Sequence, residues 1–269
     1  CVLPPALTVP EAILRASLSC TVPLDKLAQD SRPPVLLVPG TGLNPRENFG
    51  WNYVPALRKA GRSVCTVQLP QQAMGDVQNA AQYVVYAIQT LATKSQKRVQ
   101  IIGFSQGGML PRWALKFWPQ TRAQVEELIS IAGSHHGTTN THTVCRPQCA
   151  PAIWQQKSTS RFITALNKGD ETYPNIDYTA IYSYTDGVVL PSTEGAPTGI
   201  SSILKGGKNV VNISVQQLCP DVATDHLALG SYDPVTYALV RDALDNTGTA
   251  RLTRVQAYQA QLCSQRYML

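Results

Sequence analysis

The chain has 269 residues, of which 43% are hydrophobic and 15% are charged, and this composition supplies a sizeable core and excludes an intrinsically disordered chain. Its net charge of +6 comes from lysines and arginines scattered in runs of no more than two. That pattern indicates a solvated surface, with weak attraction to anionic membranes as the alternative, and it gives no support to nucleic-acid binding.

The first expected elements alternate between helix and strand. A short helical stretch at 11–16 lies in a proline-containing lead-in. The apolar run 35–38 is bounded by prolines and is typical of a buried strand. Residues 51–59 favour a helix, and residues 63–69 alternate as a strand.

The strongest helix prediction covers residues 76–93. Asp76 is a suitable N-cap residue, and six apolar side chains recur behind it at helical spacing. A buried strand at 98–102 and a helix at 107–117 follow, and residues 125–132 favour the end of a helix and then a strand. This alternation predicts an α/β fold with a mostly parallel central sheet and helices on both of its faces.

Residues 133–175 interrupt the alternation. The segment is polar and rich in threonine, so we interpret it as a small cap or loop insertion. Strands at 178–184 and 209–215 and a helix at 233–244 complete the pattern. Because no repeat or linker divides the sequence, and no apolar run reaches the roughly 18 residues that span a membrane, residues 1–269 are expected to form a single domain without a transmembrane segment.

The strongest chemical signal is the motif Gly-Phe-Ser-Gln-Gly at residues 103–107, which matches the G-x-S-x-G nucleophile elbow. The motif lies between a predicted strand and a predicted helix. A sharp turn there needs minimal side chains on either side of the serine, and Gly103 and Gly107 provide them. The N-terminus of the following helix directs backbone N–H groups toward the reacting oxygen. Ser105 is therefore the expected nucleophile.

A serine nucleophile needs a base to take its proton, and histidine is the usual one. Hydrolases with this elbow have the chain order Ser, acid, His, and His226 lies late enough to leave room for an acid before it. We expect it on a loop after the last strand. Asp186 follows strand 178–184 at a turn and is the expected acid, with Asp221 and Asp225 as rivals and Asp177 as a cap or surface charge. The remaining histidines are expected at structural or rim positions (His135, His136) and at the surface (His142).

Donors are also needed where negative charge develops on the substrate. The backbone N–H of Gln106 directly follows the nucleophile. The glycine-rich loop after the first core strand offers Thr41, through its backbone N–H and its hydroxyl. A simple tight turn is the alternative interpretation of that loop.

The seven cysteines favour disulfides and thus an oxidising compartment. The natural pairing is Cys20–Cys65, Cys145–Cys149 and Cys219–Cys263, although sequence alone does not fix it. A zinc site from Cys145, Cys149 and His142 is the alternative. Cys1 is left as a free thiol, a lipid-attachment site or a trimming artefact. Because the chain starts at Cys1 rather than Met, we expect that any signal peptide has been removed or left out, and that the protein is secreted to the exterior or the periplasm.

Several motifs occur in the order and spacing of a known family: residues 38–42 (Val-Pro-Gly-Thr-Gly), 105–108 (Ser-Gln-Gly-Gly), 154–156 (Trp-Gln-Gln), 185–186 (Thr-Asp) and 225–226 (Asp-His). Over roughly residues 16–263 the chain resembles the Candida antarctica lipase B-like family of α/β-hydrolase lipases. The resemblance implies the α/β-hydrolase fold, the triad Ser105, Asp186 and His226, and an oxyanion hole from Thr41 and Gln106. It also implies the disulfides Cys20–Cys65 and Cys219–Cys263.

Substrate contacts are expected from the residues Gly40, Phe104, Ser134, Gln156, Val188 and Val189. The sequence departs from the family at Phe104, where the relative has a tryptophan that walls its alcohol pocket, and at Gly103, where it has threonine. Residues 133–137 replace a stretch that carries an aspartate facing the cleft. The Cys145–Cys149 pair has no family counterpart and is expected to pin a lid-like loop. The sequence stops near Leu269, without the family's C-terminal extension, which predicts a more open cleft.

These observations predict a secreted, monomeric serine ester hydrolase, a lipase, which works through an acyl-enzyme without metal or cofactor. Its substrate would be an ester or lipid at an oil–water interface. The alternatives are a short-chain or polyester carboxylesterase, an acyltransferase with the same triad, and a non-catalytic lipid-binding protein. Candidates for an apolar entrance to the cleft are Leu190, Ile200, Ile203, Leu204, Leu227 and Leu229.

Overall fold

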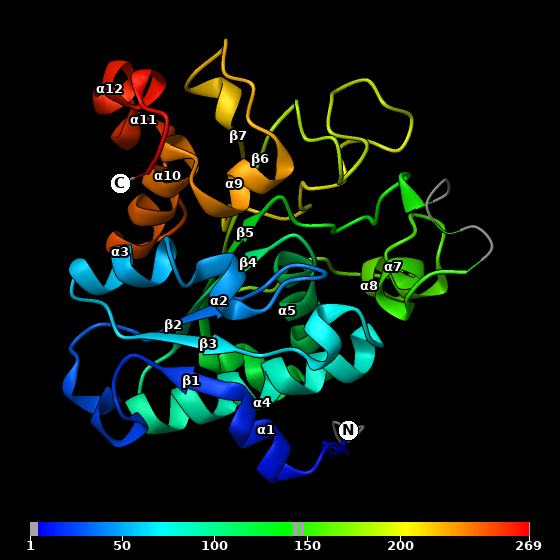
Figure 1. Ribbon diagram of the computed structural model, residues 1–269, viewed down its shortest axis with the longest axis vertical. Helices are drawn as coiled ribbons and strands as arrows, with labels where there is room; N and C mark the ends of the chain where they lie inside the picture. Colours follow the sequence, from blue (N-terminus) through cyan, green and yellow to red (C-terminus); the bar gives the residue numbers. More distant parts are fainter. Residues whose placement is uncertain (1–4, 142–144, 146–147, 269) are drawn as a thin grey trace.

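A seven-stranded sheet forms the centre of the protein (Figure 1). The computed structural model describes residues 5–141, 145 and 148–268. The strands are β1 (Leu18–Cys20), β2 (Val35–Val38), β3 (Val64–Val67), β4 (Val99–Phe104), β5 (Val125–Ile131), β6 (Asp177–Tyr182) and β7 (Val210–Ser214). Their order is β1-β3-β2-β4-β5-β6-β7, with β1 antiparallel to β3 and all other neighbours parallel. The predicted, mostly parallel sheet is confirmed.

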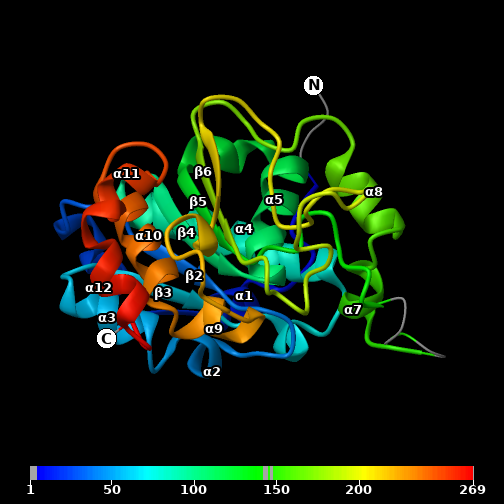
Figure 2. The same cartoon turned by 90° about the horizontal axis from the view of Figure 1, so that it is seen from above.

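Helices cover both faces of this sheet. Figures 1 and 2 show α4 (Val77–Ser95) and α5 (Gln106–Phe117) on one face and α3 (Tyr53–Lys59) and α10 (Pro234–Asp245) on the other. The shorter helices are α1 (Glu11–Ser17), α2 (Pro45–Phe49), α7 (Pro151–Gln155), α8 (Arg161–Asn167), α9 (His226–Ser231), α11 (Leu252–Val255) and α12 (Gln259–Ser264). The described residues also form five 3-10 segments between these helices and strands: η1 (Leu24–Gln29), η2 (Pro70–Ala73), η3 (Pro119–Gln124), η4 (Val215–Gln217) and η5 (Gln256–Tyr258).

Strand β2 has the sequence Val-Leu-Leu-Val and is apolar at every position. Successive side chains of a strand point to opposite faces of the sheet. Leu36 and Val38 pack into the cluster beneath α4 and α5, whereas Val35 and Leu37 pack with residues of α3 and α10. All four side chains are fully buried, and each burial contributes roughly 1.5–3 kcal/mol to stability. A sheet covered on both faces therefore needs no polar side of its strands.

Helix α4 begins where its sequence predicts. The Asp76 carboxylate accepts hydrogen bonds from the backbone N–H groups of Gln78 and Asn79, at 2.8 and 3.2 Å, so it caps the helix as expected. The six predicted apolar side chains are all fully buried, namely Val77, Ala81, Val84, Val85, Ile88 and Leu91.

The short elements are where the sequence prediction was incomplete or wrong. Strand β1 has three residues and helix α2 has five, and neither is long enough to show a hydrophobic period. The expected helix end at residue 125 is wrong, because η3 stops at Gln124 and β5 starts at Val125. The C-terminal α11, η5 and α12 were not predicted.

The insertion over residues 133–175 lies beside the main helices rather than forming a layer of its own. Within it, α7 contacts α4 and α8 contacts α5. The Cys145–Cys149 disulfide closes a small loop before α7. His142, expected at the surface or in a zinc site, and the unpaired Cys1 lie outside the described residues.

Three disulfides join the cysteines in the expected pairing. Cys20–Cys65 connects β1 to β3, and Cys219–Cys263 connects the loop after β7 to α12. Within the described part of the chain, no helix is both long and apolar enough to cross a membrane.

Candidate active site

Ser105 lies at a sharp turn between β4 and α5. Its backbone has φ 54° and ψ −120°, a conformation that residues other than glycine adopt only under strain. A Cβ atom on Gly103 would lie 1.9 Å from the carbonyl oxygen of Gly107, and one on Gly107 would lie 2.0 Å from that of Val38. The two glycines of the motif are thus needed for the turn to form at all, and strained turns of this kind cluster at functional sites.

The structure brings His226 and Asp186 together across 40 residues of sequence. His226 Nδ1 lies 2.7 Å from Asp186 Oδ2, and both side chains are buried. The other carboxylate oxygen of Asp186 accepts the backbone N–H groups of Val188 and Val189, at 2.7 and 3.0 Å. The carboxylate faces Nδ1, so Nδ1 carries the hydrogen and Nε2 is left with its lone pair.

His226 is the first residue of helix α9, whereas the sequence analysis expected it on a loop. The rival acid Asp225 is the N-cap of that helix and accepts the N–H of Ala228 at 2.9 Å. Its carboxylate is therefore engaged at the helix terminus and not with the imidazole. Asp177, expected as a cap or surface charge, is the first residue of β6.

Phe104 forms a buried wall next to the imidazole. Its ring centroid lies 4.8 Å from that of His226, and the side chain is 2% exposed. A Cβ atom on Gly230 would lie 2.3 Å from the ring, and one on Gly40 would lie 2.9 Å from it. The two glycines therefore make the space that this ring occupies.

Thr41 receives hydrogen bonds from two glutamine side chains. Gln106 Nε2 lies 2.8 Å from Thr41 Oγ1, and Gln156 Nε2 lies 2.9 Å from it. The same nitrogen atoms donate to the carbonyl oxygens of Ala73 and Ala152, which fixes which end of each amide faces Thr41. Gln106, predicted for its backbone N–H, thus also supports Thr41 through its side chain.

The segment that supports this side of the site is strained. Gln71, Gln72 and Ala73 have positive φ values of 52°, 53° and 59°. The carbonyl oxygen of Gln72 accepts the N–H of Gly42 at 2.8 Å, and that of Ala73 accepts Gln106 Nε2. Three successive left-handed residues other than glycine are costly and persist only when surrounding contacts hold them. Nothing in the sequence pattern signalled this segment.

A cavity of about 460 Å³ opens over Ser105 and His226. Besides Ser105 and His226, its lining contains five predicted site residues, Thr41, Phe104, Gln156, Val188 and Val189, and the entrance candidate Leu227. It also contains five residues that the sequence did not suggest: Leu43, Thr138, Asn140, Thr141 and Ile153. The latter five were missed because their side chains reach the cavity only through the folding of distant segments.

Two predicted substrate contacts lie behind the cavity lining. Ser134 is fully buried, and its hydroxyl donates to Gln156 Oε1 at 2.8 Å. The N–H of Gly40 donates to Asn48 Oδ1 at 3.0 Å. Ser134 thus supports the lining residue Gln156, and neither Ser134 nor Gly40 is part of the lining itself.

The mouth of the cavity is apolar. Leu227 is 63% exposed and Val188 is 47% exposed, and both line the cavity. Among the other entrance candidates, Ile200, Leu204 and Leu229 are buried. The exposed apolar surface at the mouth therefore comes from the residues that flank Asp186 and His226 in sequence.

His135 and His136 are in structural positions away from the cavity. His135 is fully buried with Nε2 2.9 Å from Ser130 Oγ, and burial holds the pKa of its imidazole well below the usual value. His136 Nε2 lies 3.1 Å from Glu171 Oε1. The structure describes no group of three or more His, Cys, Asp or Glu residues placed to hold a metal ion.

The arrangement brings three components to one cavity. They are an imidazole held by a carboxylate, a serine at a helix N-terminus, and hydroxyl and amide donors. These are the components of nucleophilic acyl transfer: a nucleophile, a base oriented by an acid, and donors for an oxyanion.

Comparisons with known proteins point to the same class. A family model described as palmitoyl protein thioesterase matches residues 34–184. Lipase B of Pseudozyma antarctica, formerly Candida antarctica, is 32% identical over 256 residues, which cover 92% of this chain and 71% of that protein.

Solved structures also match. Aspergillus fumigatus lipase B superimposes with a TM-score of 0.85 at 28% identity over 98% of this chain, and the chain spans 64% of that protein's length. The Bacillus licheniformis lipase BlEst2 in its propeptide form matches with a TM-score of 0.61 at 14% identity, over 94% of this chain and 54% of the other, which supports the fold alone. The predicted α/β-hydrolase fold is confirmed.

Proposed function

Because this chain belongs to the lipase B family of α/β-hydrolases, we propose that it is a secreted ester hydrolase with Ser105, His226 and Asp186 as its catalytic triad. The observation that carries the proposal is the meeting of these residues at one cavity. Ser105 and His226 both line it, and Asp186 Oδ2 lies 2.7 Å from His226 Nδ1.

The reaction begins with attack of Ser105 Oγ on the ester carbonyl carbon, while His226 Nε2 takes the hydroxyl proton. The new C–O bond gives a tetrahedral intermediate whose oxyanion is held by Thr41 and by the backbone N–H of Gln106. The bond between the carbonyl carbon and the leaving oxygen then breaks. His226 passes its proton to the leaving alkoxide, which departs as an alcohol. Water attacks the acyl-enzyme in the same way and releases the acid and free Ser105.

Asp186 orients the imidazole and stabilises its protonated form. Its carboxylate is held by the N–H groups of Val188 and Val189, which restrict its motion. An aspartate in this place does not take the proton itself. Its contribution depends on geometry, and removal of the triad aspartate typically costs about 10⁴-fold in kcat.

We expect the substrate to be a lipid ester. Six of the thirteen residues that line the cavity are apolar, and most of the lining surface is apolar. The mouth exposes Leu227 and Val188, which suits an acyl chain or an oil surface. Short-chain and polyester hydrolysis, and acyl transfer to an alcohol, use the same residues and remain the alternatives within this class.

A second candidate reaction is hydrolysis of acyl thioesters. It is favoured by the match of residues 34–184 to the palmitoyl protein thioesterase model. The same nucleophile and oxyanion donors serve, and the leaving group is then a thiolate that is protonated by His226.

The test is hydrolysis of p-nitrophenyl esters from acetyl to palmitoyl, then of a triolein emulsion and of palmitoyl-CoA, by the parent and by Ser105→Ala. We expect Ser105-dependent release that extends to long chains and triolein. Activity limited to short chains would indicate an esterase, and preferential release from palmitoyl-CoA a thioesterase. No Ser105-dependent release from any of them would contradict the proposal and leave a lipid-binding role, which tritium-labelled oleate binding would then measure.

We also propose that the protein is secreted and monomeric. Three disulfides suit an oxidising compartment. Thiol titration of protein isolated from the culture medium, with light scattering on a sizing column, tests both. Reduced cysteines at the six paired positions, or a dimer mass, would contradict them.

A further inference from the structure

Hydrogen bonds join the turn that carries Asp186 to the loop that leads into His226. We define residues 183–186, after β6, as the acid turn and residues 215–225, after β7, as the base loop. Strands β6 and β7 are parallel neighbours, paired from Tyr178–Val210 to Tyr182–Ser214. The acid turn and the base loop therefore leave the same edge of the sheet side by side.

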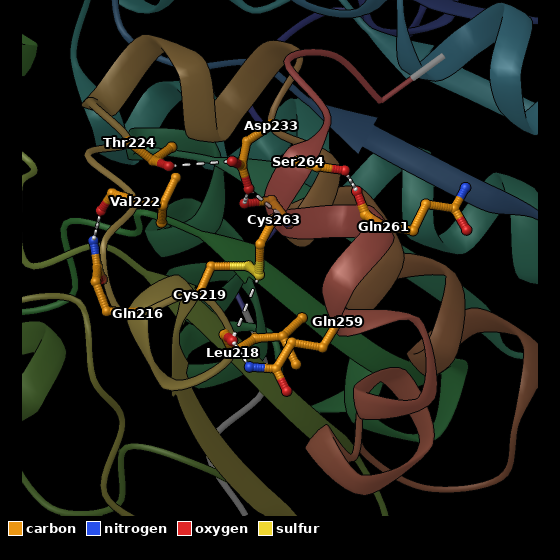
Figure 3. Close-up of a disulfide and its surroundings, with 11 residues drawn as sticks. Gln216, Leu218, Cys219, Val222, Thr224, Asp233, Gln259, Gln261, Cys263 and Ser264 are labelled. Carbon is orange, nitrogen blue, oxygen red and sulfur yellow. Dashed lines mark hydrogen bonds between the residues drawn. A yellow bond between two sulfur atoms is a disulfide. The ribbon is translucent and has the colours of Figure 1, made fainter.

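The side chain of Gln216 in the base loop makes three hydrogen bonds. Its Oε1 accepts the N–H of Tyr184 at 3.0 Å, and its Nε2 donates to Ser183 Oγ at 2.8 Å and to the carbonyl oxygen of Val222 at 3.2 Å. Figure 3 shows the bond to Val222. The orientation of the amide is fixed, because the N–H of Tyr184 requires the amide oxygen as its acceptor and the carbonyl oxygen of Val222 requires the amide nitrogen as its donor. One half-buried side chain thus ties the acid turn to the base loop.

Thr185 makes a second tie, with a fixed direction. Its hydroxyl lies 3.0 Å from the carbonyl oxygen of Thr224, to which it must donate, and 2.9 Å from Ser183 Oγ, from which it must then accept. The Ser183 hydroxyl uses its hydrogen there and accepts from Gln216. A directed chain of hydrogen bonds therefore runs from Gln216 through Ser183 and Thr185 to a carbonyl two residues before His226.

The far side of the base loop is fastened to the C-terminal helices. Figure 3 shows the Cys219–Cys263 disulfide, the bond from Gln259 Nε2 to the carbonyl oxygen of Leu218 and the bond from Thr224 to Asp233. These contacts attach the loop to α10 and α12, not to the acid turn. The position of the loop relative to the acid turn depends instead on the bonds of Gln216 and Thr185.

We propose that Gln216 is a positioning residue that sets the orientation of Asp186 and His226 relative to each other, although it touches neither. The inference rests on the proposed triad. A misplacement of about 1 Å can cost about 100-fold in rate. Truncation of Gln216 removes no atom of the Asp186–His226 bond, so we expect Gln216→Ala to lower kcat by about 10- to 100-fold, with KM changed by less than about threefold.

The decisive experiment is a double-mutant cycle on long-chain p-nitrophenyl ester hydrolysis, with Gln216→Ala, Asp186→Ala and the double variant. If Gln216 acts through the pair, its truncation costs less than about threefold once Asp186 is absent. The oxyanion donors leave enough residual activity for this to be measured. An undiminished loss in the Asp186→Ala background would overturn the inference.

Two further variants separate hydrogen bonding from packing and general loosening. Gln216→Met fills the same space without the three bonds, so it should lose as much kcat as Gln216→Ala and also stands in should the alanine variant not fold. Gln259→Ala removes a half-buried glutamine that binds the same loop at Leu218, and we expect kcat within about twofold of the parent.

The outcomes distinguish the two proposals. Parent-like kcat in Gln216→Met, or an equal loss in Gln259→Ala, would refute the positioning role while the triad stands. An Asp186→Ala enzyme as active as the parent would refute the triad and, with it, this inference.

Discussion

Gln156 and Thr41 are joined across 115 residues of sequence by a 2.9 Å hydrogen bond from the amide Nε2 to the hydroxyl Oγ1. Gln106 donates to the same oxygen at 2.8 Å. A hydroxyl oxygen has two acceptor sites and one hydrogen. With both acceptor sites filled, the hydrogen of Thr41 is the part left to donate, and Thr41 lines the cavity with Ser105. The two glutamines therefore leave the Thr41 hydroxyl hydrogen available as a donor for the proposed oxyanion hole.

Thr41→Val should lower kcat strongly. Valine keeps the shape of threonine and the backbone N–H but has no hydroxyl, so one oxyanion donor is lost. Such a loss costs about 100-fold or more in kcat with little change in KM. Thr41→Ser keeps the hydroxyl and should stay within about tenfold of the parent. Steady-state kinetics on a p-nitrophenyl ester checks both, and equal activity of the valine and serine variants would show that the hydroxyl is not a donor.

Gly230→Ala should impair both stability and rate. The added Cβ would lie 2.3 Å from the Phe104 ring, which packs against His226 with centroids 4.8 Å apart. Overpacking of this kind costs about 1–3 kcal/mol, and the displaced ring shifts the imidazole. The smaller side chain in Gly230→Ala/Phe104→Leu should recover part of kcat. Urea unfolding and kcat measure the two effects, and a double variant slower than Gly230→Ala would refute the steric explanation.

Glu127→Gln should make stability less dependent on pH. Glu127 is 2% exposed, and burial raises the pKa of its carboxyl well above the usual value, although Thr179 donates to it at 3.1 Å. The folded protein therefore binds a proton more tightly than the unfolded chain, whose carboxyl titrates near 4.5. Stability from this group is present below that pH and is lost as pH rises toward the folded-state pKa.

The glutamine variant keeps an acceptor for Thr179 and carries no charge. Its melting temperature should exceed that of the parent at pH 8 and converge with it at pH 4. Glu11→Gln, at an exposed position of α1, should follow the parent at every pH. A Glu127→Gln curve parallel to that of the parent would be inconsistent with a buried, protonated carboxyl.

The Cys219–Cys263 disulfide should contribute more to stability than the Cys145–Cys149 disulfide, because it closes a longer loop. Cys219 and Cys263 are 44 residues apart, whereas Cys145 and Cys149 are four apart. Loss of loop-closure entropy in the unfolded chain predicts about 4 kcal/mol for the first and about 2 kcal/mol for the second. Unfolding of the double-alanine variants by guanidinium measures this. A smaller loss for the longer span would show that native contacts, and not chain entropy, decide.

The sequence by itself determined the elements with a strong local signal. Residues 35–38 are apolar throughout, and residues 99–104 are apolar apart from Gln100, because both faces of their sheet are covered. Helix α4 carries an apolar stripe behind the Asp76 cap. The turn at Ser105 was predictable as well, because its flanking glycines are required by contacts within a few residues and with the neighbouring strand β2. Signals of this kind are written in consecutive residues.

The contacts between polar side chains from distant segments depend on the tertiary structure. Asp225 and Asp186 are both aspartates near a turn, and the difference between a helix cap and the partner of His226 lies in where each backbone ends. Gln216 carries no local signal, because a glutamine amide donates wherever a carbonyl or hydroxyl is within reach. Gln156 stands in a motif of the resemblance, but the motif does not say that its amide meets Thr41. Such contacts join segments tens of residues apart, and their geometry is set by the sheet register and not by the neighbouring sequence.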